Sequence, residues 1–221
     1  MSYTVTLLMT EFVTHDVKRF LISRPFGFEY QSGQGVELAI NQPEWKDQGR
    51  PFTPTSLGED KVLEFTIKEY PDHCGVTEKL HTLRPGEELL LSEAFGTITY
   101  QGPGFFIAGG AGITPFIAII RQLARDGQLA DHRLIFSNKT PADVICEKEF
   151  RYYFDENCIL TCTEANGAGY DNRFINKEFL QEKISDFNQR FYICGPPQFV
   201  KDINSALVEL GAAPNALIFE K

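Results

Sequence analysis

Residues 104–126 constrain the fold more than any other part of the sequence. Gly104–Ala108 is short and wholly apolar, which is typical of a strand that lies inside a parallel sheet and is covered on both faces. Three glycines follow closely: Gly109, Gly110 and Gly112. They let the backbone turn tightly and approach a ligand with no Cβ in the way, and Thr114 and Pro115 then have the chemistry of a helix start. The segment therefore predicts a strand, a tight turn and a helix.

A strand, a glycine turn and a helix N-terminus present free backbone N–H groups and a positive dipole end, which suits a pyrophosphate. Dinucleotide binding is the functional interpretation, and a tight turn with nothing bound is the alternative. Two features depart from the usual fingerprint. Pro115 stands where the last glycine is expected, and the strand predicted at 133–136 runs into Ser137-Asn138-Lys139, without the acidic residue that holds a ribose 2′-hydroxyl.

Composition indicates a globular, cytosolic protein. Of 221 residues 43% are hydrophobic, enough for real cores, and neither a membrane-spanning run nor a signal-peptide pattern is present in the sequence. The net charge of −9 argues against a nucleic-acid partner, which needs a positive field. The five cysteines have neither paired spacing nor grouped ligands, so no metal site is predicted: Cys74, Cys146, Cys158, Cys162 and Cys194.

The chain changes pattern near residue 102. Before it, β-prone runs separated by glycine and proline predict a small antiparallel barrel, with strands at 3–9, 36–40, 62–68 and 88–91. After it, strands and helices alternate, which predicts a parallel sheet with crossover helices. The expected strands are 105–109, 133–137, 158–163, 190–194 and 216–220, and the expected helices are 115–126, 147–156, 176–184 and 197–210. We therefore expect two domains, residues 1–102 and 103–221.

A second constellation lies in the first half, at Arg50-Pro51-Phe52-Thr53-Pro54-Thr55-Ser56. A guanidinium, an aromatic ring and three hydroxyls can hold a phosphate, cover a planar ring and hydrogen-bond its edge, as a flavin nucleotide requires. Taken alone, a proline-rich turn with a surface arginine is the simpler interpretation.

Four motifs together resemble the ferredoxin/flavodoxin–NAD(P)H reductase superfamily in order and spacing: Arg50–Ser56, Gly75–Leu80, Gly109–Pro115 and Cys194–Pro197. The resemblance covers nearly the whole chain and is closest to cytochrome b5 reductases and bacterial flavodoxin reductases. It implies a flavin-binding barrel followed by a nucleotide-binding domain, with FAD and NADP or NAD as cofactors. It also implies electron transfer to a separate redox protein such as flavodoxin, ferredoxin or a haem protein.

The resemblance assigns flavin roles residue by residue. Arg50 would bind a flavin phosphate and Thr53 would lie near flavin N5. Phe52 replaces the usual tyrosine and loses its hydroxyl bond, at a cost of about 1 kcal/mol of cofactor binding. Backbone along the flavin would come from three residues of one strand: Ile67, Lys68 and Tyr70. The FAD pyrophosphate would meet the turn into a helix at Gly75, Val76 and Thr77.

The same resemblance assigns the coenzyme end. The pyrophosphate turn would use Gly110, Gly112 and Thr114, and a second strand–turn–helix would use Cys194, Gly195 and Pro196, with Cys194 beside the reacting carbon of the nicotinamide. Ser137, Asn138 and Lys139 would meet the adenosine ribose, where a lysine without a carboxylate favours NADPH. The alternative there is a solvated lysine. Arg173 is a further candidate by family position.

Glu220 is the last predicted site residue. Several relatives carry a terminal glutamate followed by an aromatic ring that stacks on the flavin, whereas here only Lys221 follows and Phe219 is expected to pack inward. An uncovered flavin face, or one shielded by a partner chain, is therefore expected.

Two functions follow from the sequence. The first is an FAD-dependent oxidoreductase that moves a hydride from NAD(P)H to flavin and passes electrons to an external acceptor. Because the hydride passes directly between two rings, the protein's task is alignment and exclusion of water. The alternative is a non-catalytic flavin- or nucleotide-binding subunit of a larger redox complex.

Overall fold

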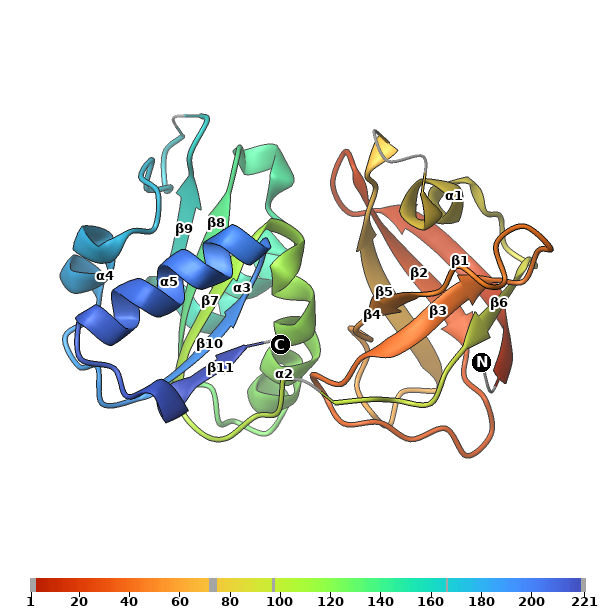
Figure 1. Ribbon diagram of the computed structural model, residues 1–221, viewed down its shortest axis with the longest axis horizontal. Coiled ribbons are helices and arrows are strands. Elements are labelled where there is room, and N and C mark those ends of the chain that lie inside the picture. Colours follow the sequence, from red (N-terminus) through yellow and green to blue (C-terminus); the bar gives the residue numbers. More distant parts are fainter. Residues whose placement is uncertain (1–2, 72–74, 97, 166, 220–221) are drawn as a thin grey trace. The chain divides into compact units, whose positions relative to one another are not determined.

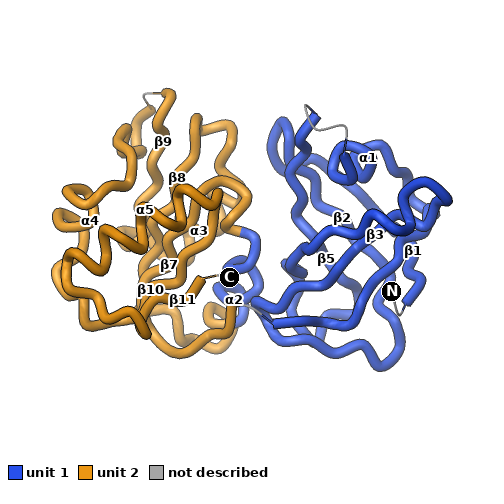
Figure 2. Tube along the Cα trace, in the orientation of Figure 1, with its two compact units in different colours: residues 1–97, 114–122 blue, residues 98–113, 123–221 orange. Residues whose placement is uncertain are grey.

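The computed structural model describes residues 3–71, 75–96, 98–165 and 167–219, and its contacts divide the chain into two compact units (Figure 2). The first unit comprises residues 1–97 together with 114–122, and the second comprises 98–113 and 123–221. The division at 102/103 inferred from the sequence remains a proposal about where independent domains meet.

The first unit is a nearly closed antiparallel barrel (Figure 1). Its strands are β1 (Tyr3–Phe12), β2 (Val17–Ser23), β3 (Val36–Ile40), β4 (Arg50–Phe52), β5 (Val62–Lys68) and β6 (Glu88–Leu91), in the order β4-β3-β6-β1-β2-β5. The chain just past β4 closes the sheet against β5, because Pro54 bridges Phe65 and the Thr55 N–H donates to the Glu64 carbonyl at 2.7 Å. The predicted barrel is confirmed, and β2 and β4 are added to it.

The barrel core follows from alternation along its strands. In β5, for example, Leu63, Phe65 and Ile67 point inward and are at most 2% exposed. The short helix α1 (Val76–Thr82) packs on the same core through Val76 and Leu80. Each fully buried side chain of this size stabilises the fold by roughly 1.5–3 kcal/mol relative to exposure.

The second unit is a five-stranded parallel sheet. Its strands are β7 (Gly104–Gly109), β8 (Arg133–Asn138), β9 (Cys158–Cys162), β10 (Arg190–Cys194) and β11 (Leu217–Phe219), in the order β11-β10-β7-β8-β9. The helices are α2 (Thr114–Arg125), α3 (Glu147–Phe154), α4 (Lys177–Lys183) and α5 (Pro197–Glu209). The alternation predicted from the sequence is confirmed, although residues 114–122 of α2 belong by their contacts to the first unit.

Helices cover both faces of the parallel sheet (Figure 1). On one face Phe179 of α4 and Leu207 of α5 share a buried core with Ile107 and Ile135 of the sheet. On the other, Phe136 meets Phe150 of α3 edge to face. Ligands of such sheets bind at the carboxyl ends of the strands, so the loops at that edge position any site. Within the described residues, no helix is long and apolar enough to cross a membrane.

Four stacked rings lie in the second unit beside the chain that enters it. The rings belong to Tyr100, Phe106, His132 and Tyr192. The Tyr192 hydroxyl donates to the Gly102 carbonyl at 2.7 Å, which fixes the approach to β7. His132 is 1% exposed, its ring lies parallel to Phe106 with centroids 5.7 Å apart, and its Nε2 is 3.0 Å from the Tyr100 hydroxyl.

The burial of His132 makes stability depend on pH. Burial lowers its pKa below the ordinary value of about 6.5, so the unfolded chain binds more protons than the folded one as the pH falls through that range. The free energy of unfolding should therefore decline below pH ~6.5, with a slope from this residue of at most about 1.4 kcal/mol per pH unit.

His132→Phe keeps the ring stack and should flatten the decline, as measured by urea unfolding at several pH values. His15→Phe, at a side chain 59% exposed, is the control. Identical profiles for wild type and His132→Phe would contradict the assignment.

Candidate functional site

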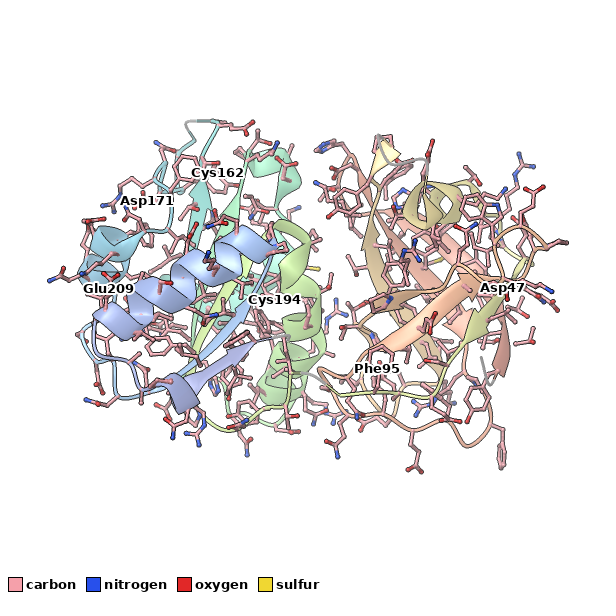
Figure 3. The ribbon with its side chains drawn as sticks, viewed as in Figure 1. Asp47, Phe95, Cys162, Asp171, Cys194 and Glu209 are labelled. Atoms are coloured by element: carbon pink, nitrogen blue, oxygen red, sulfur yellow. The ribbon has the colours of Figure 1, made fainter. Side chains whose placement is uncertain are left out.

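The two glycine turns predicted from the sequence meet at the carboxyl edge of the parallel sheet. β7 and β10 are paired neighbours, with Ala108 opposite Cys194, and their turns leave the sheet side by side (Figure 3 labels Cys194). A Cβ on Gly112 would lie 2.5 Å from the Gly195 nitrogen, closer than real Cβ contacts. Gly112 is therefore required by backbone packing between the turns.

Gly110 has a different reason to be glycine. Its φ is +53°, which L side chains rarely adopt, and a Cβ there would meet nothing within 4 Å. It begins the short 3₁₀ turn Gly110–Ile113, after which α2 starts at Thr114. Open space beside a glycine turn that runs into a helix start is suited to an anionic ligand.

Phe199 supports both turns from α5. A Cβ on Gly109 would lie 3.3 Å from the Phe199 ring, and one on Gly195 would lie 2.7 Å from it. Cys194 is 8% exposed, Gly195 is half-buried and Pro196 is exposed, so accessibility rises along the second turn. Sequence reasoning missed Phe199, although an aromatic residue in the first turn of α5 was a visible signal.

The end of β8 carries the three residues predicted to meet the adenosine ribose. Ser137 is half-buried and Asn138 is 5% exposed, with neither amide atom bonded to any described residue. Lys139 is 73% exposed, with Nζ 3.6 Å from Oε1 of Glu164. Glu164 follows β9, and its N–H donates to the Lys139 carbonyl at 2.8 Å. The sequence argument for a 2′-phosphate assumed no carboxylate at this place, and Glu164 supplies one from the neighbouring loop.

Among the described residues, Arg173 belongs to a separate ionic cluster that includes neither Lys139 nor Glu164. It bonds Asp171 at 2.7 Å and Glu182 at 2.6 Å (Figure 3 labels Asp171). These bonds hold the pKa of Asp171 below its usual range, and with Lys183 they lower the pKa of Glu182 to about 2. Two carboxylates already neutralise this guanidinium, so a coenzyme phosphate would have to compete with them.

In the barrel, Arg50 has an exposed side chain that bonds only the Gly49 carbonyl, at 2.9 Å, and forms no ion pair with any described residue. Phe52 is half-buried and packs on the barrel core. Thr53 is half-buried, and its hydroxyl bonds none of the described residues. A free guanidinium and a free hydroxyl three residues apart suit a ligand phosphate and a polar ring edge.

The other predicted flavin residues belong to β5 and α1. Ile67 is buried, and its carbonyl is 2.8 Å from Nε2 of His81. Lys68 pairs with Asp16 at 2.6 Å, and Tyr70 is 42% exposed.

Gly75 is the N-cap of α1, and Val76 and Thr77 form its first turn. Glu220 lies outside the described residues, as does Cys74.

Comparison with known proteins finds a family match that covers most of the second unit. Residues 106–205 match the oxidoreductase NAD-binding domain family. The predicted resemblance to the ferredoxin/flavodoxin–NAD(P)H reductase superfamily is thereby confirmed.

The named relatives are reductases. The chain is 26% identical, over 95% of its length, to the ferredoxin–NAD(P)⁺ reductase component of the naphthalene 1,2-dioxygenase system of Pseudomonas putida. It is 28% identical, over 86% of its length, to NADH-cytochrome b5 reductase 2 of Mycosarcoma maydis. It spans 65% and 60% of the lengths of these proteins.

The two-unit fold is shared with a solved ferredoxin NADP⁺ reductase from Neisseria gonorrhoeae with bound FAD and NADP. The TM-score is 0.82, the sequence identity is 23%, and the match covers 99% of this chain and 97% of that one.

Two glycines test whether the turn Gly110–Ile113 holds a ligand. Gly110→Ala and Gly127→Ala both place alanine at positive φ in open space, so each should cost about 1–2 kcal/mol of stability. Only Gly110→Ala should also weaken NADH binding, since Gly127 lies at the far end of α2. Thermal unfolding and NADH titration measure the two effects. Equal NADH affinity in the two variants would show that this turn does not bind the coenzyme.

Proposed function

We propose that the chain is an FAD-dependent oxidoreductase that takes a hydride from NADH or NADPH and passes electrons to an external redox protein. The observation that carries the proposal is the meeting of the two turns, at Gly112 and Cys194–Gly195, on the carboxyl edge of a sheet in a NAD-binding domain. The match to named reductases supports the enzyme over a non-catalytic subunit.

Arg50, Phe52 and Thr53 would hold the flavin in the barrel. The unpaired guanidinium of Arg50 would bind a phosphate, the Phe52 ring would lie along the cofactor, and the free Thr53 hydroxyl would bond the polar edge near N5. Backbone of Ile67, Lys68 and Tyr70 would border the ring. Gly75–Thr77 would receive the remaining phosphate at the start of α1.

The nicotinamide coenzyme would lie on the turns of the second unit. Gly110, Gly112 and Thr114 would face its pyrophosphate, and the turn at Cys194, Gly195 and Pro196 would face its nicotinamide. Cys194, nearly buried, would define the position of the reacting carbon and keep water from it. Ser137, Asn138 and Lys139 would meet the adenosine ribose, and the unbonded amide of Asn138 supports a polar ligand group there.

The bound flavin would supply the chemistry of accepting two electrons as a hydride and releasing them one at a time. The external acceptor is then a small redox protein: ferredoxin, flavodoxin or a haem protein. The relatives named as a ferredoxin reductase component and as cytochrome b5 reductases support this class.

Arg50 provides the direct test of the flavin site. Arg50→Ala should weaken FAD binding about ten- to a hundredfold, because a charged hydrogen bond contributes roughly 1.5–3 kcal/mol. Titration of apoprotein with FAD measures the affinity, and anaerobic addition of NADH or NADPH to the yellow protein should bleach the flavin absorbance. Arg84→Ala removes another exposed barrel arginine and should change neither. The proposal would be refuted by a wild type that does not bind FAD, or by a bound flavin that neither NADH nor NADPH reduces.

Coenzyme choice should rest on the Lys139–Glu164 pair. Lysine attracts a 2′-phosphate, whereas the carboxylate repels it and can accept from a 2′-hydroxyl, so we expect both coenzymes to serve. Because both side chains are well exposed, Glu164→Gln should raise the NADPH:NADH ratio of kcat/KM by about three- to tenfold, and Lys139→Ala should lower it similarly. The control is the remote Lys177–Glu209 pair, 2.9 Å apart, changed by Glu209→Gln. If neither Glu164→Gln nor Lys139→Ala changes the NADPH:NADH ratio of kcat/KM, this pair does not determine coenzyme choice.

A further inference from the structure

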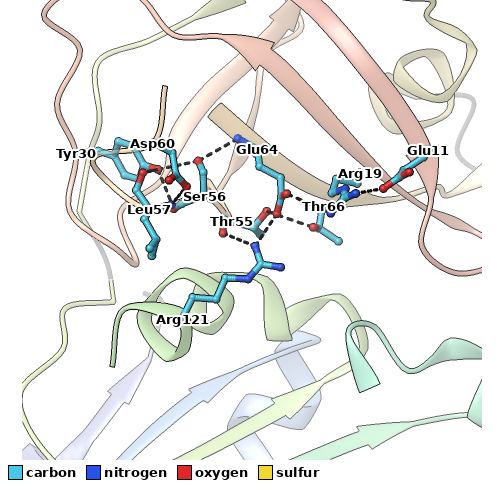
Figure 4. Close-up of polar contacts among 10 residues, drawn as sticks. All are labelled: Glu11, Arg19, Tyr30, Thr55, Ser56, Leu57, Asp60, Glu64, Thr66 and Arg121. Atoms are coloured by element: carbon cyan, nitrogen blue, oxygen red, sulfur yellow. Dashed lines mark hydrogen bonds and ion pairs between the residues drawn. The ribbon is translucent and has the colours of Figure 1, made fainter. Parts of the chain in front are cut away.

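We propose that Arg121 is a positioning residue for the flavin, acting through the segment that follows Thr53. The inference rests on the proposed flavin site and adds to it a side chain from α2. Nη1 of Arg121 donates to the Thr55 carbonyl at 2.8 Å and to Oε1 of Glu64 at 2.7 Å (Figure 4). All three residues belong to the first unit, and Arg121 is 22% exposed.

Glu64 is the centre of this network. Its side chain is 13% exposed, and Oε1 accepts from both Arg121 and the Thr55 hydroxyl, the latter at 2.7 Å. Arg19 lies 3.6 Å from Oε2 and also pairs with Glu11. A carboxylate this far from water must be paired and hydrogen-bonded, and Arg121 is its nearest cation.

The same network fixes the backbone of residues 53–56, the segment that includes the hydroxyl proposed to meet the flavin. Glu64 exchanges backbone bonds with the segment, accepting from the Thr55 N–H at 2.7 Å and donating its own N–H to the Ser56 hydroxyl at 3.0 Å. Tyr30 donates to the Ser56 carbonyl at 2.8 Å. The hydroxyls of Thr55 and Ser56 are thus bonded within the protein. Thr53 is half-buried, and of the three hydroxyls only its own bonds none of the described residues.

Arg121 therefore acts two residues beyond the hydroxyl proposed to meet the flavin. It anchors the Thr55 carbonyl, which no other described contact in this network holds, and it neutralises the carboxylate that holds the Thr55 hydroxyl. Without the guanidinium the segment 53–55 can shift, and small displacements of a positioned polar group weaken its bond to a ligand.

The test compares FAD affinity with apoprotein stability. Arg121→Met should raise the Kd for FAD at least fivefold and change the fine structure of the bound flavin's visible absorption band. Arg121→Lys, whose ammonium can donate to both oxygens, should restore part of the affinity. Arg125→Met, on the same helix at an arginine 42% exposed, should bind FAD as wild type does. Thermal unfolding of each apoprotein ensures that titrations are made well below its midpoint.

The outcomes separate this inference from the proposed function. Suppose that the wild type binds FAD and that Arg121→Met changes the Kd less than fivefold, even if it lowers the unfolding temperature. The arginine is then purely structural, and this inference alone is overturned. A wild type that binds no FAD would overturn both. If Arg121→Met does not fold, Arg121→Lys and Glu64→Gln decide. Glu64→Gln keeps an acceptor for Arg121 but loses its charge, so an intermediate Kd is expected, and wild-type affinity in both variants would overturn the inference.

Discussion

A close approach of two backbones organises the second unit. Gly112 lies so near the Cys194–Gly195 peptide that no side chain fits between them, and this contact is possible only because β7 and β10 are adjacent and in register. The Phe199 ring closes over the glycines on either side. Both turns are thus set by the pairing of two strands and by one aromatic contact, so a coenzyme would bind a surface that is already formed.

A buried charge organises the first unit in a comparable way. Glu64 lies in β5, where the segment just past β4 closes the barrel. Its bonds to Thr55, Ser56 and Arg121 both close the barrel and satisfy the polar groups there. Replacing a buried ion pair by apolar residues can be neutral for stability, so stability alone gives no reason for a carboxylate at this position. Its geometric effect on the neighbouring segment does.

Much of this architecture could be predicted from the sequence because it depends on local patterns. The apolar run at 104–109 and the alternation after residue 130 predicted the parallel sheet almost strand for strand. The strand β2 was missed because Phe20, Leu21 and Ile22 form a continuous apolar run that hides the period of two. The strand β4 was missed because it is three residues long and contains a proline.

The candidate site, too, could be predicted where it depends on local patterns and not where it depends on distant pairings. Single-segment features such as the glycine turns and Arg50 were visible, whereas pairings between distant segments were not. Glu164 meets Lys139 only because β8 and β9 are neighbours, and Arg121 meets Glu64 across 57 residues of sequence. A cation within the apolar helix at 116–123 was a signal that could have been noticed, but nothing local identified its partner.

The contact between Gly112 and Gly195 also governs when the site can come into being. β7 and β8 lie close in sequence and can pair early, yet the second edge of β7 stays open until residues 190–194 have been synthesised and inserted beside it. Before that moment the glycine turn has no opposing backbone, and its shape is not yet imposed. Closure across more than eighty residues is nonlocal and therefore slow, so a growing chain would form the surface proposed for the coenzyme among the last of its features.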